Sequence, residues 1–327
     1  MSITEFSHSK EAFTETLSRI LLIPEYRIIK LHLQLEQWGE PCDLSYGKCN
    51  LQKAGEILMR TSLSSFLYLN YSLNEAIQHI AMAGFDAVDI WGGRPHAYRN
   101  DLHEHDIRSL HNQLDDFGLE IASFIPAQCD LCSPHTAIRM DGIRDIQTSI
   151  ELAARLEASI ISILPGHSLH HQCPDEGWDL LADSLARIGE FAGHYDVLLA
   201  IEPADKYASD LINTTVQAMD MIDQIGCDNF GVVFDTGHAL IAGEDTDTAI
   251  RALGDRLFHI HLSDNHRERD ERLIPGKGRF DFQTLIATLK STQFEGFLTA
   301  EPGWQYTLDP DSAAIETREF LEFILQE

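Results

Sequence analysis

The sequence predicts an α/β fold, a closed (β/α)8 barrel, and three observations support this. Between residues 62 and 327, eight short apolar runs alternate with eight longer segments of helical periodicity. The runs are apolar almost throughout, which is typical of parallel strands covered by helices. Eight such units in about 265 residues match the usual size of this barrel. No GxGxxG follows the first strand, which argues against an open, doubly wound sheet.

The predicted elements alternate strictly in chain order. The first strand, 62–68, precedes a helix over 72–84, in which Ser72 and Glu75 have capping-box spacing. Further strands are expected at 85–91, 119–125, 158–164, 196–202, 230–235, 257–264 and 296–302. Further helices are expected at about 104–117, 136–156, 176–194, 214–226, 245–253, 281–290 and 310–326.

Residues 1–58 do not follow this alternation. They contain one apolar helical pattern, over residues 17–35, and then an irregular polar stretch. Met59 stands directly before the first strand. We interpret residues 59–327 as the catalytic barrel domain and residues 1–58 as an extension without a catalytic role. The extension is either a small packing element or the product of a start codon assigned too early.

The charge balance excludes some classes of partner. Acidic residues outnumber basic ones, 52 to 24, for a net charge of −28, and no basic groove is recognisable. Such a charge repels nucleic acid and anionic membranes. No stretch approaches the roughly 20 apolar residues of a membrane span, and no signal-peptide pattern is present. We therefore expect a small neutral or cationic ligand, or a site that a metal neutralises.

The cysteines indicate a reducing compartment. Six of them are scattered along a chain too long to need disulfides, which favours a cytoplasmic location. The CxxC of Cys129 and Cys132 is a weak metal motif, because no second pair accompanies it. The same holds for the stretch HSLHHQC over 167–173, in which we interpret His170 and His171 as exposed loop residues.

Four consecutive predicted strands end in a residue that can bind a metal. In barrels of this type the active site lies at the carboxyl ends of the strands. Taken singly, each such residue would more often be a helix cap or a satisfied polar group. Together, three carboxylates at one barrel mouth would repel one another without a cation. The four residues are Glu202, Asp235, His261 and Glu301.

This set of ligands indicates which metal to expect. Carboxylates and one imidazole favour Mn²⁺ or Mg²⁺, with Co²⁺ as a further candidate, over the sulfur-rich sites of structural zinc. We expect Mn²⁺. Asp235 and His261 would form the back of the metal site.

The two glutamates are expected to face each other. Their strands are three steps apart in an eight-strand ring, about 135 degrees. Opposed carboxylates can remove a proton from one face of a substrate and return one to the other face. With a carbonyl polarised by the metal, an enediolate would form between Glu202 and Glu301. This chemistry is epimerisation or aldose–ketose isomerisation of a sugar.

Residues around the ligands have weaker predicted roles. His238 lies one turn into the loop after Asp235, where it would hydrogen-bond a substrate hydroxyl or the outer shell of the metal, unless it is only a helix cap. Arg267 or Arg269, in the loop after the seventh strand, would neutralise oxyanion charge, unless both are solvated. His167, after the fourth strand, is a candidate substrate contact and, in a nuclease-like site, a candidate additional metal ligand.

The strand-end motifs resemble those of a known superfamily. IEP, FDTGH, HIHLSD followed by PGKGRFDF, and AEPGW are similar, in order and spacing, to motifs of the xylose isomerase-like TIM barrels that isomerise and epimerise sugars. The resemblance covers about residues 60–327. Its D-tagatose 3-epimerase branch implies that the two metal-binding glutamates are catalytic. It also implies metal ligands at Asp235 and His261, and substrate contacts at His238 and Arg267.

A second local resemblance concerns the predicted second strand. The stretch DIWGGRPHAY, 89–98, is similar to the corresponding motif of fructoselysine 3-epimerase-like proteins. The resemblance implies that Trp91, Arg94 and His96 lie near the barrel mouth, where a ring and two polar groups would grip a polyol.

One departure from the pattern leaves the substrate open. Many ketose epimerases carry a further glutamate six residues after the fifth-strand glutamate, and Ala208 stands there. An aldose isomerase, an inosose-type or dehydroshikimate-type dehydratase, and an enzyme for modified sugars, phosphorylated or free, all remain alternatives. The number of subunits also stays open, a homo-oligomer included.

Two alternatives belong to other functional classes. The superfamily contains endonuclease IV-like DNA repair enzymes, which use additional metal-binding histidines and a basic groove. The charge of −28 argues against DNA as a partner. A barrel that only binds a sugar is the non-enzymatic alternative, and the retention of both opposed glutamates argues against it.

Overall fold

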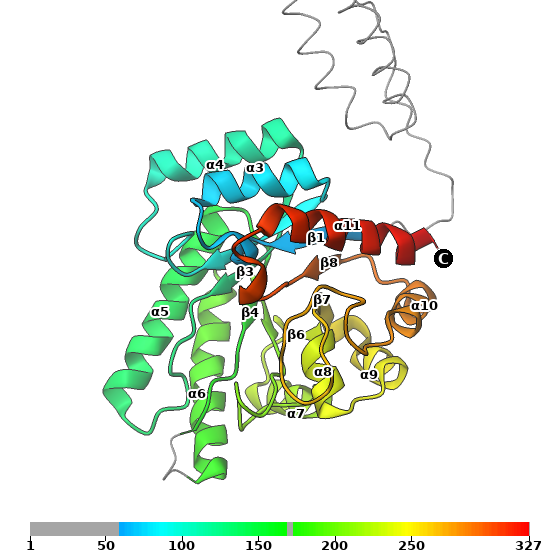
Figure 1. Cartoon of the computed structure of the whole chain (residues 1–327). Coiled ribbons are helices and arrows are strands. Elements are labelled where there is room, and N and C mark those ends of the chain that lie inside the picture. Colours follow the sequence, from blue (N-terminus) through cyan, green and yellow to red (C-terminus); the bar gives the residue numbers. More distant parts are fainter. Residues whose placement is uncertain (1–58, 169–172, 327) are drawn as a thin grey trace, which may run out of the picture. The chain divides into compact units, whose positions relative to one another are not determined.

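The computed structural model describes residues 59–168 and 173–326. The expectations for residues 1–58 and for His170 and His171 lie outside these residues. Within them, eight parallel strands pair in chain order and close into one barrel, with β8 beside β1. Figure 1 shows the helices placed around the strands. The predicted (β/α)8 fold is therefore confirmed.

The strands are short, and most of their residues are buried. All six residues of β6 are buried, because helices cover its outer side and the other strands enclose its inner side. This explains why FGVVFD is apolar until its last residue. The strands are β1 (Arg60–Ser64), β2 (Ala87–Gly92), β3 (Glu120–Pro126), β4 (Ile160–Ile163), β5 (Leu198–Ile201), β6 (Phe230–Asp235), β7 (Leu257–Leu262) and β8 (Phe297–Ala300).

The helices begin and end at the signals that the sequence carries. The capping box of Ser72 and Glu75 is formed, and Gly84 ends the same helix in the left-handed conformation. The α-helices are α3 (Leu73–Ala83), α4 (Glu104–Phe117), α5 (Thr136–Arg155), α6 (Pro174–Ala192), α7 (Thr215–Ile225), α8 (Thr236–Ala242), α9 (Thr246–Leu253), α10 (Phe282–Thr292) and α11 (Pro310–Gln326). The 3₁₀ turns are η1 (Ser65–Tyr68), η2 (Gly254–Arg256) and η3 (Trp304–Tyr306). Among the described residues, no helix combines the length and apolar character needed to cross a membrane.

Two expectations about the path of the chain were wrong. The first strand was expected at 62–68, but it ends at Ser64, whose hydroxyl accepts the N–H of Phe66 and turns the chain into η1. The segment after Asp235 was expected to be a loop and is the helix α8. Asp235 caps this helix by accepting the N–H of His238 at 2.7 Å, so one carboxylate both ends β6 and starts α8.

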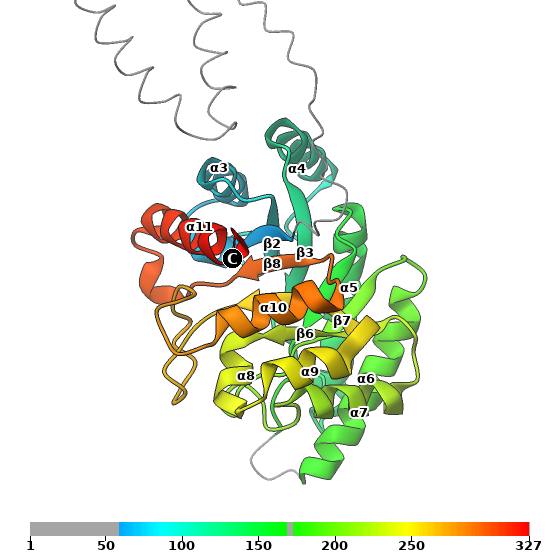
Figure 2. The same cartoon turned by 90° about the vertical axis from the view of Figure 1, so that its right-hand side faces the viewer.

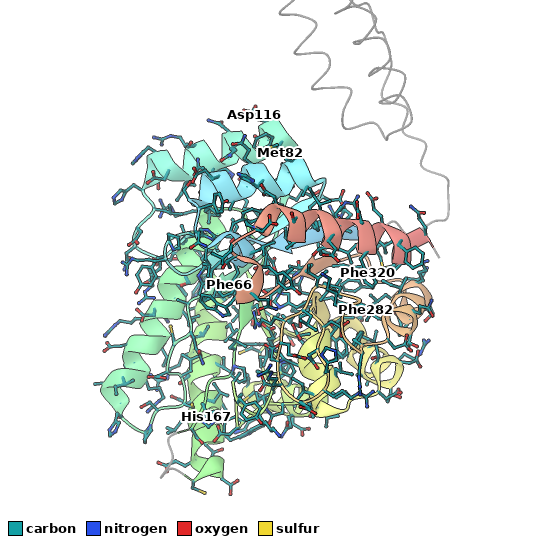
Figure 3. All side chains as sticks on the ribbon, viewed as in Figure 1. Phe66, Met82, Asp116, His167, Phe282 and Phe320 are labelled. Atoms are coloured by element: carbon teal, nitrogen blue, oxygen red, sulfur yellow. The ribbon has the colours of Figure 1, made fainter. Side chains whose placement is uncertain are left out.

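Side-chain contacts join neighbouring helices of the outer layer. Figure 2 shows α9 and α10 side by side, and the Thr288 hydroxyl of α10 donates to Asp247 of α9 at 2.8 Å. Phe282 of α10 meets Phe320 of α11 edge to face at 5.3 Å, and both are labelled in Figure 3. The helical layer thus supplies much of the apolar packing, while polar side chains occupy part of the barrel interior.

Candidate active site and metal centre

The four predicted metal ligands converge at the carboxyl ends of β5 to β8. One ligand atom of each lies within 4.8 Å of the others. Each of the four residues is at most 5% exposed. The register of β6 and β7 places Asp235 directly beside His261, while Glu202 and Glu301 directly follow β5 and β8. Closure of the barrel therefore creates the cluster that the strand ends predicted.

Gly237 allows α8 to pack closely on the end of β7. A Cβ atom at this position would collide with the Ser263 hydroxyl. That hydroxyl also donates to Asp235 at 3.4 Å. The glycine in FDTGH is thus needed for a close approach that keeps Asp235 and its helix against the neighbouring strand.

His261 lies between two of the carboxylates. Its Nδ1 is 3.0 Å from Oε1 of Glu202 and 3.6 Å from Oε2 of Glu301. Burial lowers the pKa of His261, but Glu301 and Glu202 outweigh this and hold it well above its usual range. Burial raises the pKa of Glu202, yet His261 brings it below its usual range. The cluster therefore stabilises a positive charge at its centre.

The pKa values of the other two carboxylates, Glu301 and Asp235, are raised, in part because negative charges lie close together. The pKa of Glu301 is raised by burial and by the neighbouring carboxylates, against His261 and Arg272. The pKa of Asp235 is raised mainly by burial, with Glu202 contributing. Three buried carboxylates and one imidazole within reach of a single ion fit a divalent cation that prefers oxygen and nitrogen ligands.

Arg272 is the cation that reaches the carboxylates. Its Nη1 lies 3.5 Å from Oε2 of Glu301, and its Nε donates to Asp270 at 2.9 Å. Burial lowers the pKa of Arg272, but Glu301 and Asp270 more than offset this, so the guanidinium stays charged. The sequence pattern did not point to Arg272, because its position depends on an antiparallel bridge between Asp264 and Leu273 that sets the path of the loop.

The two arginines that sequence analysis named lie elsewhere. Arg267 is exposed, and its backbone N–H donates to Oδ1 of Asn265. The side chain of Arg269 is 76% exposed and pairs with Glu271. The structure thus brings Arg272, and neither of these residues, to Glu301. A contact between Arg267 and a substrate stays a prediction.

His238 is buried beside the cluster. Its ring Nδ1 accepts the backbone N–H of Asp205 at 3.1 Å, so the neutral ring carries its hydrogen on Nε2. Asp205, His238 and Asp270 also offer atoms within 4.8 Å of one another. A hydrogen bond from the Nε2–H of His238 to a substrate stays a prediction.

The second-strand motif is held mainly by bonds within the protein. Both ring nitrogens of His96 are bonded, to Ser65 Oγ and to the backbone oxygen of Tyr68, each at 3.1 Å. Arg94 donates to both carboxylate oxygens of Asp101. These bonds engage the polar groups through which His96 and Arg94 were expected to grip a polyol. That expectation stays a prediction.

Trp91 belongs to an aromatic group of three residues, which we call the aromatic wall. Phe66 meets Trp91 edge to face at 5.4 Å and Trp304 at 5.0 Å. The three residues come from η1, β2 and η3, at the carboxyl ends of the adjacent strands β1, β2 and β8. Trp304 is 66% exposed. The aromatic wall therefore presents a ring to solvent on the same end of the barrel as the glutamates.

His167, Cys129 and Cys132, all within the described part of the chain, do not join the metal-competent cluster. His167 Nδ1 is 2.9 Å from the backbone oxygen of Ser168 and 3.4 Å from Asp210. Among the described residues, it belongs to none of the groups that could hold a metal ion. Burial raises the pKa of Cys129 and of Cys132 to about 11, so both are thiols at neutral pH.

Two buried polar residues beneath the cluster were missed. Asp89 of β2 is fully buried, and its Oδ2 lies 3.0 Å from His261 and 3.2 Å from His259. The sequence held one signal: His259 and His261 are two apart in a strand, so both point to the same side. Their common partner, from a strand 170 residues away, could not be foreseen.

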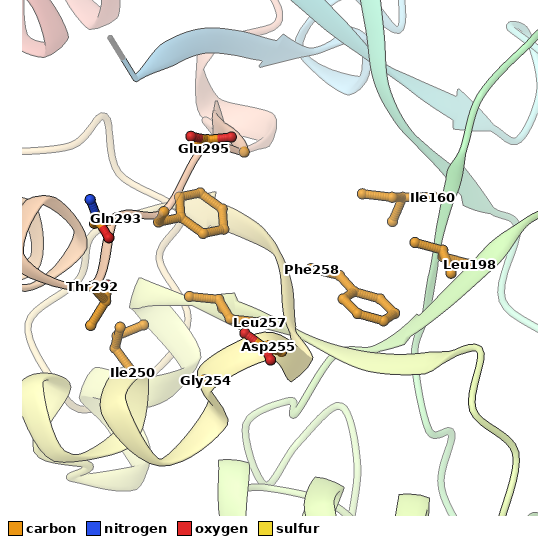
Figure 4. Close-up of a pocket in the computed structure, with 12 residues that line it drawn as sticks. Ile160, Leu198, Ile250, Gly254, Asp255, Leu257, Phe258, Thr292, Gln293 and Glu295 are labelled. Carbon is orange, nitrogen blue, oxygen red and sulfur yellow. The ribbon is translucent and has the colours of Figure 1, made fainter. Parts of the chain in front are cut away.

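A cavity of about 330 Å³ lies at the other end of the barrel. Figure 4 shows its lining, which comes from the amino ends of β4, β5 and β7, from Ile250, Gly254 and Asp255 ahead of β7, and from residues 292–296. Its titratable side chains are Asp255 and Glu295. Its lining includes none of the predicted site residues, so the cavity is separate from the predicted site.

Comparisons with known proteins agree with this architecture. A family model described as the xylose isomerase-like TIM barrel matches residues 77–324. Fructoselysine 3-epimerase of Shigella flexneri is 23% identical over 273 residues, which cover 82% of this chain and 99% of that protein. L-ribulose 3-epimerase of Mesorhizobium japonicum is 27% identical over 255 residues, 75% of this chain and 81% of that protein.

The solved structures show the same fold. A structure of an L-ribulose 3-epimerase superposes with a TM-score of 0.72 and 23% identity, covering 82% of this chain and 95% of that one. The resemblance stated from the strand-end motifs is thereby confirmed.

Proposed function

The chain belongs to the xylose isomerase-like TIM barrel family, and on this basis we propose that it is a divalent-metal-dependent sugar isomerase or epimerase. The observation that carries the proposal is the convergence of three buried carboxylates and one imidazole within 4.8 Å. The similarity to proteins named as sugar 3-epimerases supports the reaction class. A small carbohydrate is the proposed substrate, and the cytoplasm is the proposed location.

The residues that would hold the metal are Glu202, Asp235, His261 and Glu301. Their oxygen-rich donor set favours Mn²⁺, with Mg²⁺ and Co²⁺ as alternatives. When bound, a divalent ion supplies Lewis-acid polarisation of a substrate carbonyl. Ser162 donates to Oε2 of Glu202 at 2.8 Å and so holds that carboxylate in a fixed orientation.

The proposed role of the two glutamates is proton transfer on opposite faces of the substrate. One carboxylate takes the proton from the carbon beside the carbonyl, and the C–H electron pair forms an enediolate. The other glutamate, as a carboxylic acid, gives a proton to the opposite face of the same carbon. The carbonyl re-forms, the configuration is inverted, and the protonation states of Glu202 and Glu301 are exchanged.

Neighbouring side chains would orient the substrate. The Nε2–H of His238 would donate to a substrate oxygen, and Arg272 would offset negative charge next to Glu301. The aromatic wall would contact the apolar face of a sugar. Because Ala208 stands where many ketose epimerases carry a glutamate, the particular sugar stays open. The proposed substrate class is a carbonyl compound with several hydroxyl groups.

The experiment that tests the proposal is proton NMR in D₂O with Mn²⁺, on ketoses, ketose phosphates, inososes and dehydroshikimate. We expect solvent deuterium at the carbon that is epimerised or isomerised, because its proton leaves and returns through exchangeable carboxylates. Retention of the substrate hydrogen over many turnovers would indicate a hydride shift and overturn the two-glutamate mechanism.

The same experiment separates the other reaction classes. Loss of water from an inosose or from dehydroshikimate, without epimerisation, would assign a dehydratase. Binding without label exchange would assign a sugar-binding barrel. Retarded mobility of abasic-site DNA in a parallel assay would support the nuclease alternative.

A further inference from the structure

Asp89 lies beneath the metal-competent cluster, on the inner side of the barrel. It is 0% exposed, and its Oδ2 is 3.0 Å from Nε2 of His261 and 3.2 Å from Nε2 of His259. His259 Nε2 is also 3.0 Å from the hydroxyl of Thr299. One carboxylate oxygen of β2 therefore contacts two histidines that project from β7.

The two nitrogens of His261 face different partners. Nδ1 points to Glu202 and Glu301, whereas Nε2 points to Asp89. An imidazole nitrogen that binds a metal must present its lone pair, so the neutral ring must carry its hydrogen on the other nitrogen. The acceptor at that other nitrogen is the Asp89 carboxylate. The geometry thus assigns Nδ1 to the metal side and Nε2–H to Asp89.

Asp89 also contacts a second histidine of β7, because its Oδ2 lies 3.2 Å from Nε2 of His259. Since a lone pair on His259 Nε2 would repel the carboxylate, this nitrogen also donates to Asp89. His259 therefore anchors the acceptor, and the acceptor orients the ring of His261.

We propose that Asp89 is a positioning residue that fixes His261 in the Nε2–H form and thereby sets the affinity of the metal centre. The inference rests on the proposed metal centre. A carboxylate is costly in this place, because Oδ1 of Asp89 is buried without a hydrogen-bond partner. If the residue only filled space, an apolar side chain of similar volume would serve better.

The test measures Mn²⁺ binding by calorimetry to the chelator-stripped full chain. Asp89→Asn keeps the shape, but its amide can donate to Nε2 and drive the hydrogen of His261 onto Nδ1. We expect Mn²⁺ to bind about 10–100-fold more weakly, the range found for partners of metal-bound histidines. Ser123→Ala is the matched control, because Ser123 pairs with Asp89 in the β2–β3 register and its buried hydroxyl has no hydrogen-bond partner.

The outcomes distinguish this inference from the proposed function. If the unaltered protein does not bind Mn²⁺, the proposed metal centre fails and the inference fails with it. If the unaltered protein binds Mn²⁺ and the affinity of Asp89→Asn lies within about twofold of it, only the positioning role is overturned. If Ser123→Ala weakens binding as much, the effect reflects packing, which also overturns it.

A second variant covers the case in which Asp89→Asn does not fold. His259→Gln removes the anchoring imidazole and leaves the Asp89 carboxylate in place. We expect a smaller loss of Mn²⁺ affinity, about three- to tenfold, because Asp89 is then less restrained. Unchanged affinity in a folded His259→Gln protein would overturn the relay from His259 through Asp89 to His261.

Discussion

The carboxyl end of the barrel buries four titratable residues that could hold a metal ion, whereas the amino end leaves a cavity of about 330 Å³. The cavity is lined by apolar side chains such as Leu257 and Phe258, together with the segment 292–296 (Figure 4). Glu202 and Glu301 have almost no exposed surface at the opposite end of the same strands.

This difference leads us to place the proposed site by buried charge rather than by open volume. Burying like charges together is costly, and a fold retains such an arrangement only where a cation or a reaction uses it. The two carboxylates in the lining of the cavity, Asp255 and Glu295, are exposed to solvent and need no such compensation. Five predictions test this contrast.

The largest effect is expected from the residues at the back of the proposed metal site. Asp235→Asn or His261→Ala should abolish turnover. Mn²⁺ should then no longer raise the melting temperature, since a metal bound only by the folded state stabilises it, by about 2.7 kcal/mol at 100 times Kd. Calorimetry measures the melting temperature of each protein with Mn²⁺ and with chelator. If Mn²⁺ shifts the melting of variant and unaltered protein equally, these side chains are structural.

The next effect concerns the two glutamates. Glu202→Gln and Glu301→Gln keep the size and one oxygen but remove the base, so turnover should fall about 10²–10⁴-fold in each. Mn²⁺ affinity should fall far less than in Asp235→Asn. Turnover by NMR and Mn²⁺ titration check this. If the loss of turnover in each variant is fully explained by its loss of Mn²⁺ affinity, the two glutamates bind the metal but do not transfer protons.

The charge of the cluster predicts a pH effect on stability. The pKa of His261 is raised, so its contribution is complete below the ordinary value of 6.5 and is lost as the pH rises through the raised value. In chelator, the melting temperature should therefore fall over that range. With Mn²⁺ the fall should be smaller, because the ion replaces the proton. If the melting temperature falls equally with pH in chelator and in Mn²⁺, the prediction is contradicted.

A smaller effect is expected at the aromatic wall. Trp304→Ala should raise KM about tenfold, or 1.4 kcal/mol, with little change in kcat, because the indole is proposed to contact the substrate and takes no part in the proposed proton transfer. Stability should change by less than about 0.5 kcal/mol at such an exposed position. Leu308→Ala is the control, since Leu308 is 92% exposed and has no place in the wall. Equal KM values for Trp304→Ala and Leu308→Ala would show that the aromatic wall does not contact the substrate.

The smallest effect is expected at the amino end. Asp255→Asn alters a titratable residue of the cavity, yet kcat/KM should stay within about twofold, because chemistry in this fold lies at the other end of the strands. A loss of tenfold or more would show that the cavity is coupled to the site.

Local patterns in the sequence determined the fold and the four proposed ligands. Apolar strands alternating with helices predict a parallel barrel, and barrel geometry then brings the strand ends together. Glu202, Asp235 and Glu301 could be named because each directly follows or ends an apolar run. Capping signals such as Ser72 with Glu75 are equally local, so the start of α3 was predicted correctly.

Only the tertiary structure decided which polar residues meet across the barrel or over its mouth. Asp89 contacts His261 from 172 residues away, and no periodicity encodes such a contact. Arg272 rather than Arg267 reaches Glu301, because one antiparallel bridge sets the path of the loop. Patterns along a chain report which face of an element is buried, but the partner of a buried polar group depends on how distant strands are brought into register.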